Sequence, residues 1–195
     1  MPVIICTFGT GSLFMRKFFA HRAIRREIQQ NPRNRAFVGL SQAHTIGILA
    51  KFTGKEDFEL LKKYVAYVKE YGKKIKCMVF SEGKAIPEDI SWSKVEFEFF
   101  LGTDLNWYGK PGGVYLNNFK EEAFDVLLDL NLGSDICLSF LAAGSRATFK
   151  IGPSGSLNRE YLDMCIELKG DQTLKNLLRQ IDIYFEMLNK PEKTQ

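Results

Sequence analysis

The stretch FDVLLDLNLGSDICLSFLAAGSRATFKIGP, residues 124–153, decides the fold. It holds two apolar runs of strand length, separated by a glycine-containing turn and a segment rich in leucine and alanine. Short apolar runs bounded by turn residues are typical of buried strands, and a longer Leu- and Ala-rich segment favours a helix. The stretch therefore predicts a strand, a tight turn, a short helix and a second strand.

The same alternation continues outward along the chain. Apolar runs at 45–52, 75–82 and 95–102 predict further strands, and helical spacing of apolar residues predicts a helix after Gly54 and another near the carboxyl end. Strands that are apolar on both faces and alternate with helices are typical of a mostly parallel sheet covered on both sides. We predict a three-layer α/β sandwich, Rossmann-like or flavodoxin-like, with a mostly parallel sheet of about six strands.

Length and composition limit the domain organisation. With 195 residues, of which 45% are apolar, the chain is long enough for one sizeable core and too short for two full α/β domains. We expect one domain at 41–190, preceded by a basic, helical extension at 1–40 and followed by a frayed tail at 191–195.

Several classes of site and location are disfavoured by the sequence. The four cysteines have no C-x-x-C spacing and the chain has only two histidines, so we expect no metal site and a reducing, cytoplasmic location. The G-T-G at 9–11 lacks the third small residue and the acid of a dinucleotide fingerprint, so we expect no bound cofactor. The apolar run at 1–14 is too short to span a bilayer, and no other segment is long enough.

Positive charge is concentrated at the amino terminus. Residues 1–40 hold seven Lys or Arg and one acid, although the net charge of the whole chain is only +4. One interpretation is a helical arm that contacts an anionic membrane or RNA; the other is a solvated face with Phe18 and Phe19 docked on the domain. The candidate contact residues are Arg16, Lys17, Arg22, Arg25 and Arg26.

The loop DLNWYGKPGG, residues 104–113, combines aromatic, charged, amide and glycine residues. Its aromatic rings would stack on a sugar or base while its polar groups hydrogen-bond the ligand. A tryptophan in a glycine-rich loop also serves as an apolar plug that fixes the loop to the core. The candidate ligand-binding residues of this loop are Asp104, Asn106, Trp107, Tyr108 and Lys110.

Two polar residues, Asp129 and Asn131, follow the strand of the opening stretch. Ligands bind at the carboxyl ends of strands in open α/β sheets, so we expect both residues to line the same crevice as the loop. The alternative is a strand end that hydrogen-bonds neighbouring loops. Ser134 is the expected N-cap of the following helix, and the acid Asp135 disfavours an anion there.

The opening stretch is similar to a segment in the amino-terminal Rossmann-like domain of heptosyltransferase-like glycosyltransferases. There an aspartate-bearing strand is followed by a Leu/Ala-rich helix, a small Ala-Gly turn and a strand ending in Ile-Gly. Residues 45–190, with DLNWYGKP and YLDMCIEL, also resemble an uncharacterised bacterial family. The first resemblance implies a relative of the acceptor-side domain. The catalytic acid of those enzymes follows a glycine, whereas here Gly54 is followed by Lys55 and Glu56.

These observations favour a non-catalytic domain that binds a small molecule or a partner. One alternative is a glycosyltransferase-like enzyme that needs a separate nucleotide-sugar-binding partner. A second alternative is a peripheral adaptor that uses the basic helix. The sequence contains no G-x-S-x-G, and neither histidine lies in a recognisable catalytic motif.

Overall fold

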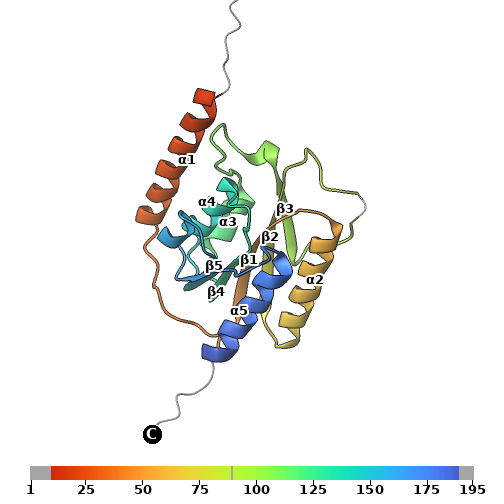
Figure 1. Ribbon diagram of the computed structural model, residues 1–195. Helices are drawn as coiled ribbons and strands as arrows, with labels where there is room; N and C mark the ends of the chain where they lie inside the picture. Colours follow the sequence, from red (N-terminus) through yellow and green to blue (C-terminus); the bar gives the residue numbers. More distant parts are fainter. Residues whose placement is uncertain (1–9, 89, 189–195) are drawn as a thin grey trace, which may run out of the picture.

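A computed structural model describes residues 10–88 and 90–188 of the chain (Figure 1). Six strands form one sheet in the order β3-β2-β1-β4-β5-β6, and all neighbouring strands are parallel. The predicted three-layer, Rossmann-like α/β architecture is confirmed, because this is the strand order of two βαβαβ halves that meet at β1 and β4. The strands are β1 Thr45–Lys51, β2 Lys74–Ser81, β3 Phe97–Leu101, β4 Val126–Asp129, β5 Phe149–Pro153 and β6 Met164–Ile166.

Helices cover both faces of the sheet. One apolar core joins the sheet to α2 and α5, and a second joins its other face to α3 and α4, with α1 packed against α4 (Figure 1). The α-helices are α1 Thr10–Gln30, α2 Lys55–Glu70, α3 Val114–Glu121, α4 Ile136–Gly144 and α5 Leu174–Leu188, and two 3-10 turns are η1 Gly102–Asp104 and η2 Asn158–Glu160. The described residues between β2 and β3 form neither helix nor strand, as their short length predicts.

Alternate residues of each central strand enter opposite cores. On β1, Ile46 and Ile48 face α2 and α5, while Leu49 faces α4. Gly47 lies on the α4 side, where an added Cβ would approach the ring of Phe124 to 2.8 Å. Both faces of these strands are therefore buried, which explains why they appear in the sequence as continuous apolar runs.

The helix α1, Thr10–Gln30, lies within the region 1–40, where a basic, helical extension is expected from the sequence. Its residues Ala20 and Ile24 are fully buried in the core shared with α4. After the helix, the Asn31 side chain donates hydrogen bonds to the carbonyls of Ala143 and Ser145, at the end of α4. The carboxyl-terminal half of α1 is thus fixed to the domain, while its amino-terminal end extends beyond the sheet (Figure 1).

Candidate binding cavity at the carboxyl edge of the sheet

The carboxyl ends of β1 and β4 mark the point where the strand order reverses. The chain leaves β1 toward β2 on one side and leaves β4 toward β5 on the other, which opens a crevice between the two connections. A cavity of about 710 Å³ lies at this edge, between α1 and the segments that follow β2, β3 and β4. Its polar and aromatic lining includes Arg16, Lys17, Glu82, Asn106, Trp107 and Asp135.

A lysine bridges the connections on the two sides of the crevice. The Lys51 Nζ atom, at the end of β1, lies 2.7 Å from Glu82 Oε1 and 3.0 Å from Asp135 Oδ1. Partial burial opposes the charged form of Lys51, but the hydrogen bonds to the two carboxylates outweigh it and raise its pKa. The second carboxylate oxygen of Asp135 is buried and accepts no hydrogen bond from a described residue.

The prediction from sequence missed Lys51 and Glu82. Each ends or follows a buried strand, which is the same signal that singled out Asp129. The position of a charged residue at the end of an apolar strand could therefore have indicated both residues from the sequence. Their pairing with Asp135 joins residues far apart in the chain, and this could be found only from the strand order.

The 104–113 loop has a fixed conformation beside the cavity. The Asn106 Oδ1 atom accepts hydrogen bonds from the backbone N–H groups of Tyr108 and Lys110, and Gly109 has a φ of 88°. This turn leaves 62% of Trp107 exposed, with its ring edge-on to those of Phe19 and Tyr108. Asn106 and Trp107, two of the seven predicted ligand-binding residues, line the cavity.

The other three predicted residues of this loop hold it in place. The Asp104 carboxylate accepts a hydrogen bond from the Leu101 backbone, and the Tyr108 ring packs against that of Phe140. Lys110 forms an ion pair with Glu27 of α1 at 2.5 Å. These contacts attach the loop to β3, α4 and α1, outside the cavity lining.

Asp129 and Asn131 are buried and do not line the cavity. Asp129 is fully buried and accepts hydrogen bonds from the Asn131 backbone and the Tyr161 hydroxyl, and burial raises its pKa to about 6. The Asn131 side chain donates to the Asp135 carbonyl and accepts from the Asp135 backbone N–H. The two residues therefore shape the turn that carries Asp135 into the cavity, and their own side chains do not line it.

A buried lysine lies near Asp129. Lys150 Nζ donates hydrogen bonds to the carbonyls of Ala142 and Ala143 in the last turn of α4, where the helix dipole favours a cation. Burial lowers the pKa of Lys150 to about 7, and the nearby Asp129 acts in the opposite direction. The side of β4 and β5 that faces α4 thus holds an acid and a base within an otherwise apolar core.

The start of α4 corrects the prediction that Ser134 is its N-cap. The N-cap is Asp135, and Ser134 adopts a left-handed conformation with a φ of 54°. The Asn131 side chain already accepts the Asp135 backbone N–H, which moves the beginning of the helix one residue further along. In the first turn, burial and then the Asp135 carboxylate raise the pKa of the Cys137 thiol to about 12.

The five basic residues predicted on α1 have different surroundings. Arg16 and Lys17 line the cavity, and Arg25 forms a bidentate contact with Glu160. Arg22 and Arg26 are exposed, and neither forms an ion pair within the described part of the chain. No helix among residues 10–88 and 90–188 is long and apolar enough to cross a membrane.

Comparison with known proteins identifies a family and no activity. Residues 16–188 match the sequence model of a family described as a family of unknown function, DUF6913. No curated protein shows a significant match to the chain. The expectation of an uncharacterised family is confirmed by this match, and the resemblance to glycosyltransferases gains no support from it.

Proposed function

The chain belongs to this family of unknown function, and we propose that it is a small-molecule-binding domain whose ligand occupies the cavity at the carboxyl edge of the sheet. The observation that carries the proposal is the position of this cavity at the carboxyl edge of the sheet, beside the reversal of the strand order, where segments that follow β2, β3 and β4 line it. In open α/β sheets this is where ligands bind. A volume of about 710 Å³ also falls within the range of small-molecule sites.

The lining favours a ligand that combines a flat ring, hydroxyl groups and an anionic group. Trp107 offers an exposed aromatic surface, on which a planar ring gains stacking energy. Arg16 and Lys17 supply positive charge on the α1 side, while Glu82 and Asp135 supply acceptors on the sheet side. A mononucleotide or nucleotide sugar has all three groups, and we take it as the ligand class.

The site supports binding better than nucleophilic catalysis. Cys137 is the thiol in the cavity lining, and its raised pKa keeps it protonated and therefore a poor nucleophile at neutral pH. Neither described histidine lines the cavity, since His21 lies on the outer side of α1 and His44 immediately precedes β1. The described lining therefore holds no histidine that could act as the general base for the Cys137 thiol.

Thermal unfolding with added nucleotides tests the proposal. Wild-type protein is titrated with a panel of nucleoside monophosphates and nucleotide sugars while the unfolding temperature is recorded. A ligand that binds only the folded state raises this temperature as its concentration increases. We expect stabilisation by at least one member of the panel, and loss of that stabilisation in Trp107→Ala.

Tyr71→Ala is the matched control, because Tyr71 is an aromatic residue of similar exposure, 59%, at the end of α2 away from the cavity. We expect this variant to respond to the ligand as wild type does. Equal stabilisation of wild type and Trp107→Ala would show that the ligand binds elsewhere. A lack of response to the entire panel would refute the nucleotide class. The nucleotide sugars also test the glycosyltransferase-like alternative, which additionally requires turnover with a partner protein.

A further inference from the structure

The outer face of α1 carries an apolar end followed by a basic segment. Three apolar side chains near its amino terminus are exposed, Phe14 by 75% and Met15 and Phe18 by 56% each. Arg22 and Arg26 follow on the next turns, on the side of the helix opposite the buried Ala20 and Ile24. We call the set Phe14, Met15, Phe18, Arg22 and Arg26 the α1 outer face.

The α1 outer face contains no acid. The one acidic residue of α1, Glu27, is directed to the domain, where it pairs with Lys110 and lies 3.7 Å from Lys120. Arg22 and Arg26 have no ion-pair partner among residues 10–88 and 90–188. Their charge therefore remains available to an external anionic partner.

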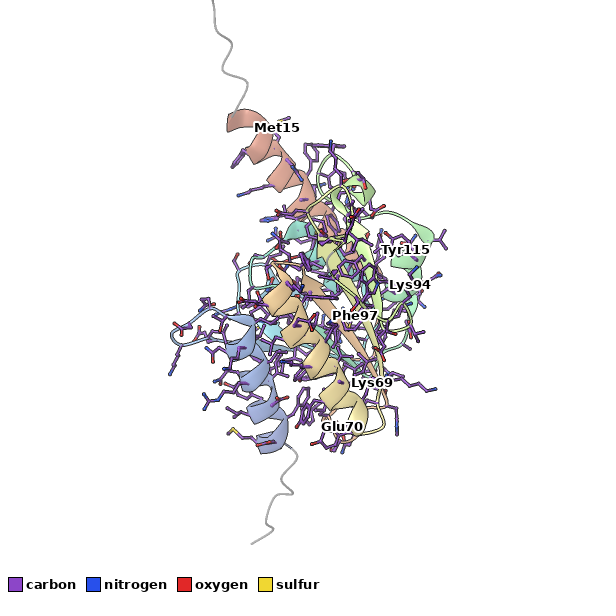
Figure 2. The ribbon with its side chains drawn as sticks, turned by 90° about the vertical axis from the view of Figure 1, so that its right-hand side faces the viewer. Met15, Lys69, Glu70, Lys94, Phe97 and Tyr115 are labelled. Atoms are coloured by element: carbon purple, nitrogen blue, oxygen red, sulfur yellow. The ribbon has the colours of Figure 1, made fainter. Side chains whose placement is uncertain are left out.

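The exposed apolar groups form part of a longer aromatic edge. The ring centroids of Phe18 and Phe19 lie 5.8 Å apart, and those of Phe19 and Trp107 lie 5.4 Å apart. This edge joins α1 to the 104–113 loop, at the end of the molecule where α1 extends beyond the sheet. Figure 2 shows Met15 near that end of α1, at the opposite end of the molecule from Lys69 and Glu70 on α2.

We propose that the α1 outer face binds the surface of an anionic phospholipid bilayer. Exposed apolar side chains gain free energy when they enter the boundary between headgroups and acyl chains, and arginines gain about 1 kcal/mol each near anionic lipids. Both features are present on one side of one helix. A single-stranded RNA would pair with the arginines and stack bases on the phenylalanine rings, but it offers no apolar phase for Phe14, Met15 and Phe18 together, so a bilayer accounts for more of the surface.

This arrangement places the cavity mouth beside the membrane. Arg16 and Lys17, on the turn of α1 between Met15 and Phe18, line the cavity, and Trp107 belongs both to the cavity wall and to the aromatic edge. A bilayer contacting the α1 outer face would therefore lie next to the opening. The inference itself rests on the exposed face of α1 and does not depend on a ligand in the cavity.

Sedimentation with lipid vesicles tests the proposal on the full chain. Vesicles of phosphatidylcholine alone and of phosphatidylcholine with phosphatidylserine are mixed with wild-type protein, and the bound fraction is measured at low and at high salt. We expect binding to the phosphatidylserine vesicles, decreasing with added salt, and much weaker binding to phosphatidylcholine alone. Arg22→Glu/Arg26→Glu should reduce the binding constant by at least about thirtyfold, and Phe14→Ala/Phe18→Ala by about tenfold or more.

The matched control is Lys175→Glu/Arg179→Glu. These two exposed basic residues have the same i, i+4 spacing on α5, away from the α1 outer face, and the reversal changes the net charge equally. We expect the control to bind vesicles nearly as wild type does. An equal loss of vesicle binding in the control would refute the assignment of binding to the α1 outer face. Failure of wild type to bind the vesicles, with or without binding to a single-stranded RNA, would refute the membrane proposal while leaving the nucleotide proposal untouched.

Discussion

Lys51 and Asp135 join the two halves of the sheet, with 3.0 Å between the Lys51 Nζ and Asp135 Oδ1 atoms. The lysine ends β1, and the aspartate occupies the N-cap position of the helix that follows β4. The side chain of Asp135 is 17% exposed and that of Lys51 is 25% exposed, so the pair is largely shielded from solvent. It closes the base of the crevice where the strand order reverses.

Replacing Lys51 with methionine should destabilise the protein by about 2 kcal/mol, because the Asp135 carboxylate would be left without a cation in a mostly buried position. Urea unfolding gives the free energy of unfolding. Glu82→Gln serves as the comparison, since Glu82 is 70% exposed and its pairing with Lys51 is worth less than about 1 kcal/mol. Equal losses in the two variants would contradict the assigned role of the buried pair.

Burial of Asp129 predicts a pH-dependent contribution to stability. Its pKa is about 6 in the folded protein against an ordinary value of 3.8, so the folded state binds more protons between these values. The contribution of Asp129 is therefore greatest below about pH 4 and decreases by about 3 kcal/mol as the pH rises through 6.

Asp129→Asn should remove this component. The free energy of unfolding of wild type, minus that of the variant, should fall between pH 4 and pH 7 and then become constant. Denaturant unfolding at several pH values measures this difference in free energy. The contributions of the other titrating groups are common to both proteins and therefore cancel. Asp171→Asn, at an exposed position, controls for the loss of a carboxylate. A difference that rises with pH would show that Asp129 is stabilised as the anion.

Gly152 of β5 lies beside Asp129 of the neighbouring strand β4, where there is no room for a Cβ atom. An alanine Cβ at this position would lie 2.6 Å from the Asp129 carbonyl oxygen and 2.9 Å from the Asp129 Cβ. Because a backbone atom cannot move aside without shifting the strand, Gly152→Ala should destabilise the protein by about 2 to 3 kcal/mol. Gly112→Ala, whose nearest contact is 3.9 Å away, should change stability by less than about 0.5 kcal/mol. Thermal or urea unfolding compares them.

Arg33 attaches the segment between α1 and β1 to the domain. Its side chain is 4% exposed, and its guanidinium pairs with Asp163 at 2.7 Å and donates to the carbonyls of Ala147 and Thr148. Arg33→Met should cost about 3 kcal/mol in unfolding free energy, because Asp163 and the carbonyls lose their donor.

Arg35→Met offers a close control for Arg33. Arg35 approaches the same aspartate at 4.0 Å but is 56% exposed, so its removal should cost less than about 0.5 kcal/mol. Equal losses of unfolding free energy in the two variants would contradict the stabilising role assigned to burial of the Arg33 ion pair.

The layers of the fold could be predicted from the sequence because the central strands are buried on both faces. Ile46, Leu49 and their counterparts on β2 and β4 give continuous apolar runs, which leave little ambiguity between strand and loop. The cap of α4 could not be predicted in the same way. Ser134 and Asp135 are both favourable N-cap residues, and the choice depends on a hydrogen bond from the Asp135 backbone to the Asn131 side chain.

The candidate site was predicted in part. The exposure of Trp107 follows from its short glycine-rich loop, which is local information. The burial of Asp129 is not local, because Tyr161, a residue beyond β5, covers it. Likewise, the bridge from Lys51 to Glu82 and Asp135 depends on which strands become neighbours, and no spacing within the sequence encodes that.

The central position of β1 has a consequence for synthesis on the ribosome. β1, β2 and β3 emerge in order and pair with one another, but the second edge of β1 is completed only when residues 126–129 follow. Until then a row of backbone donors and acceptors on a nascent chain is open to other polypeptides. This edge of β1 stays open while residues 52–125 are translated, and we expect the nascent chain to be most prone to non-native strand pairing during that interval.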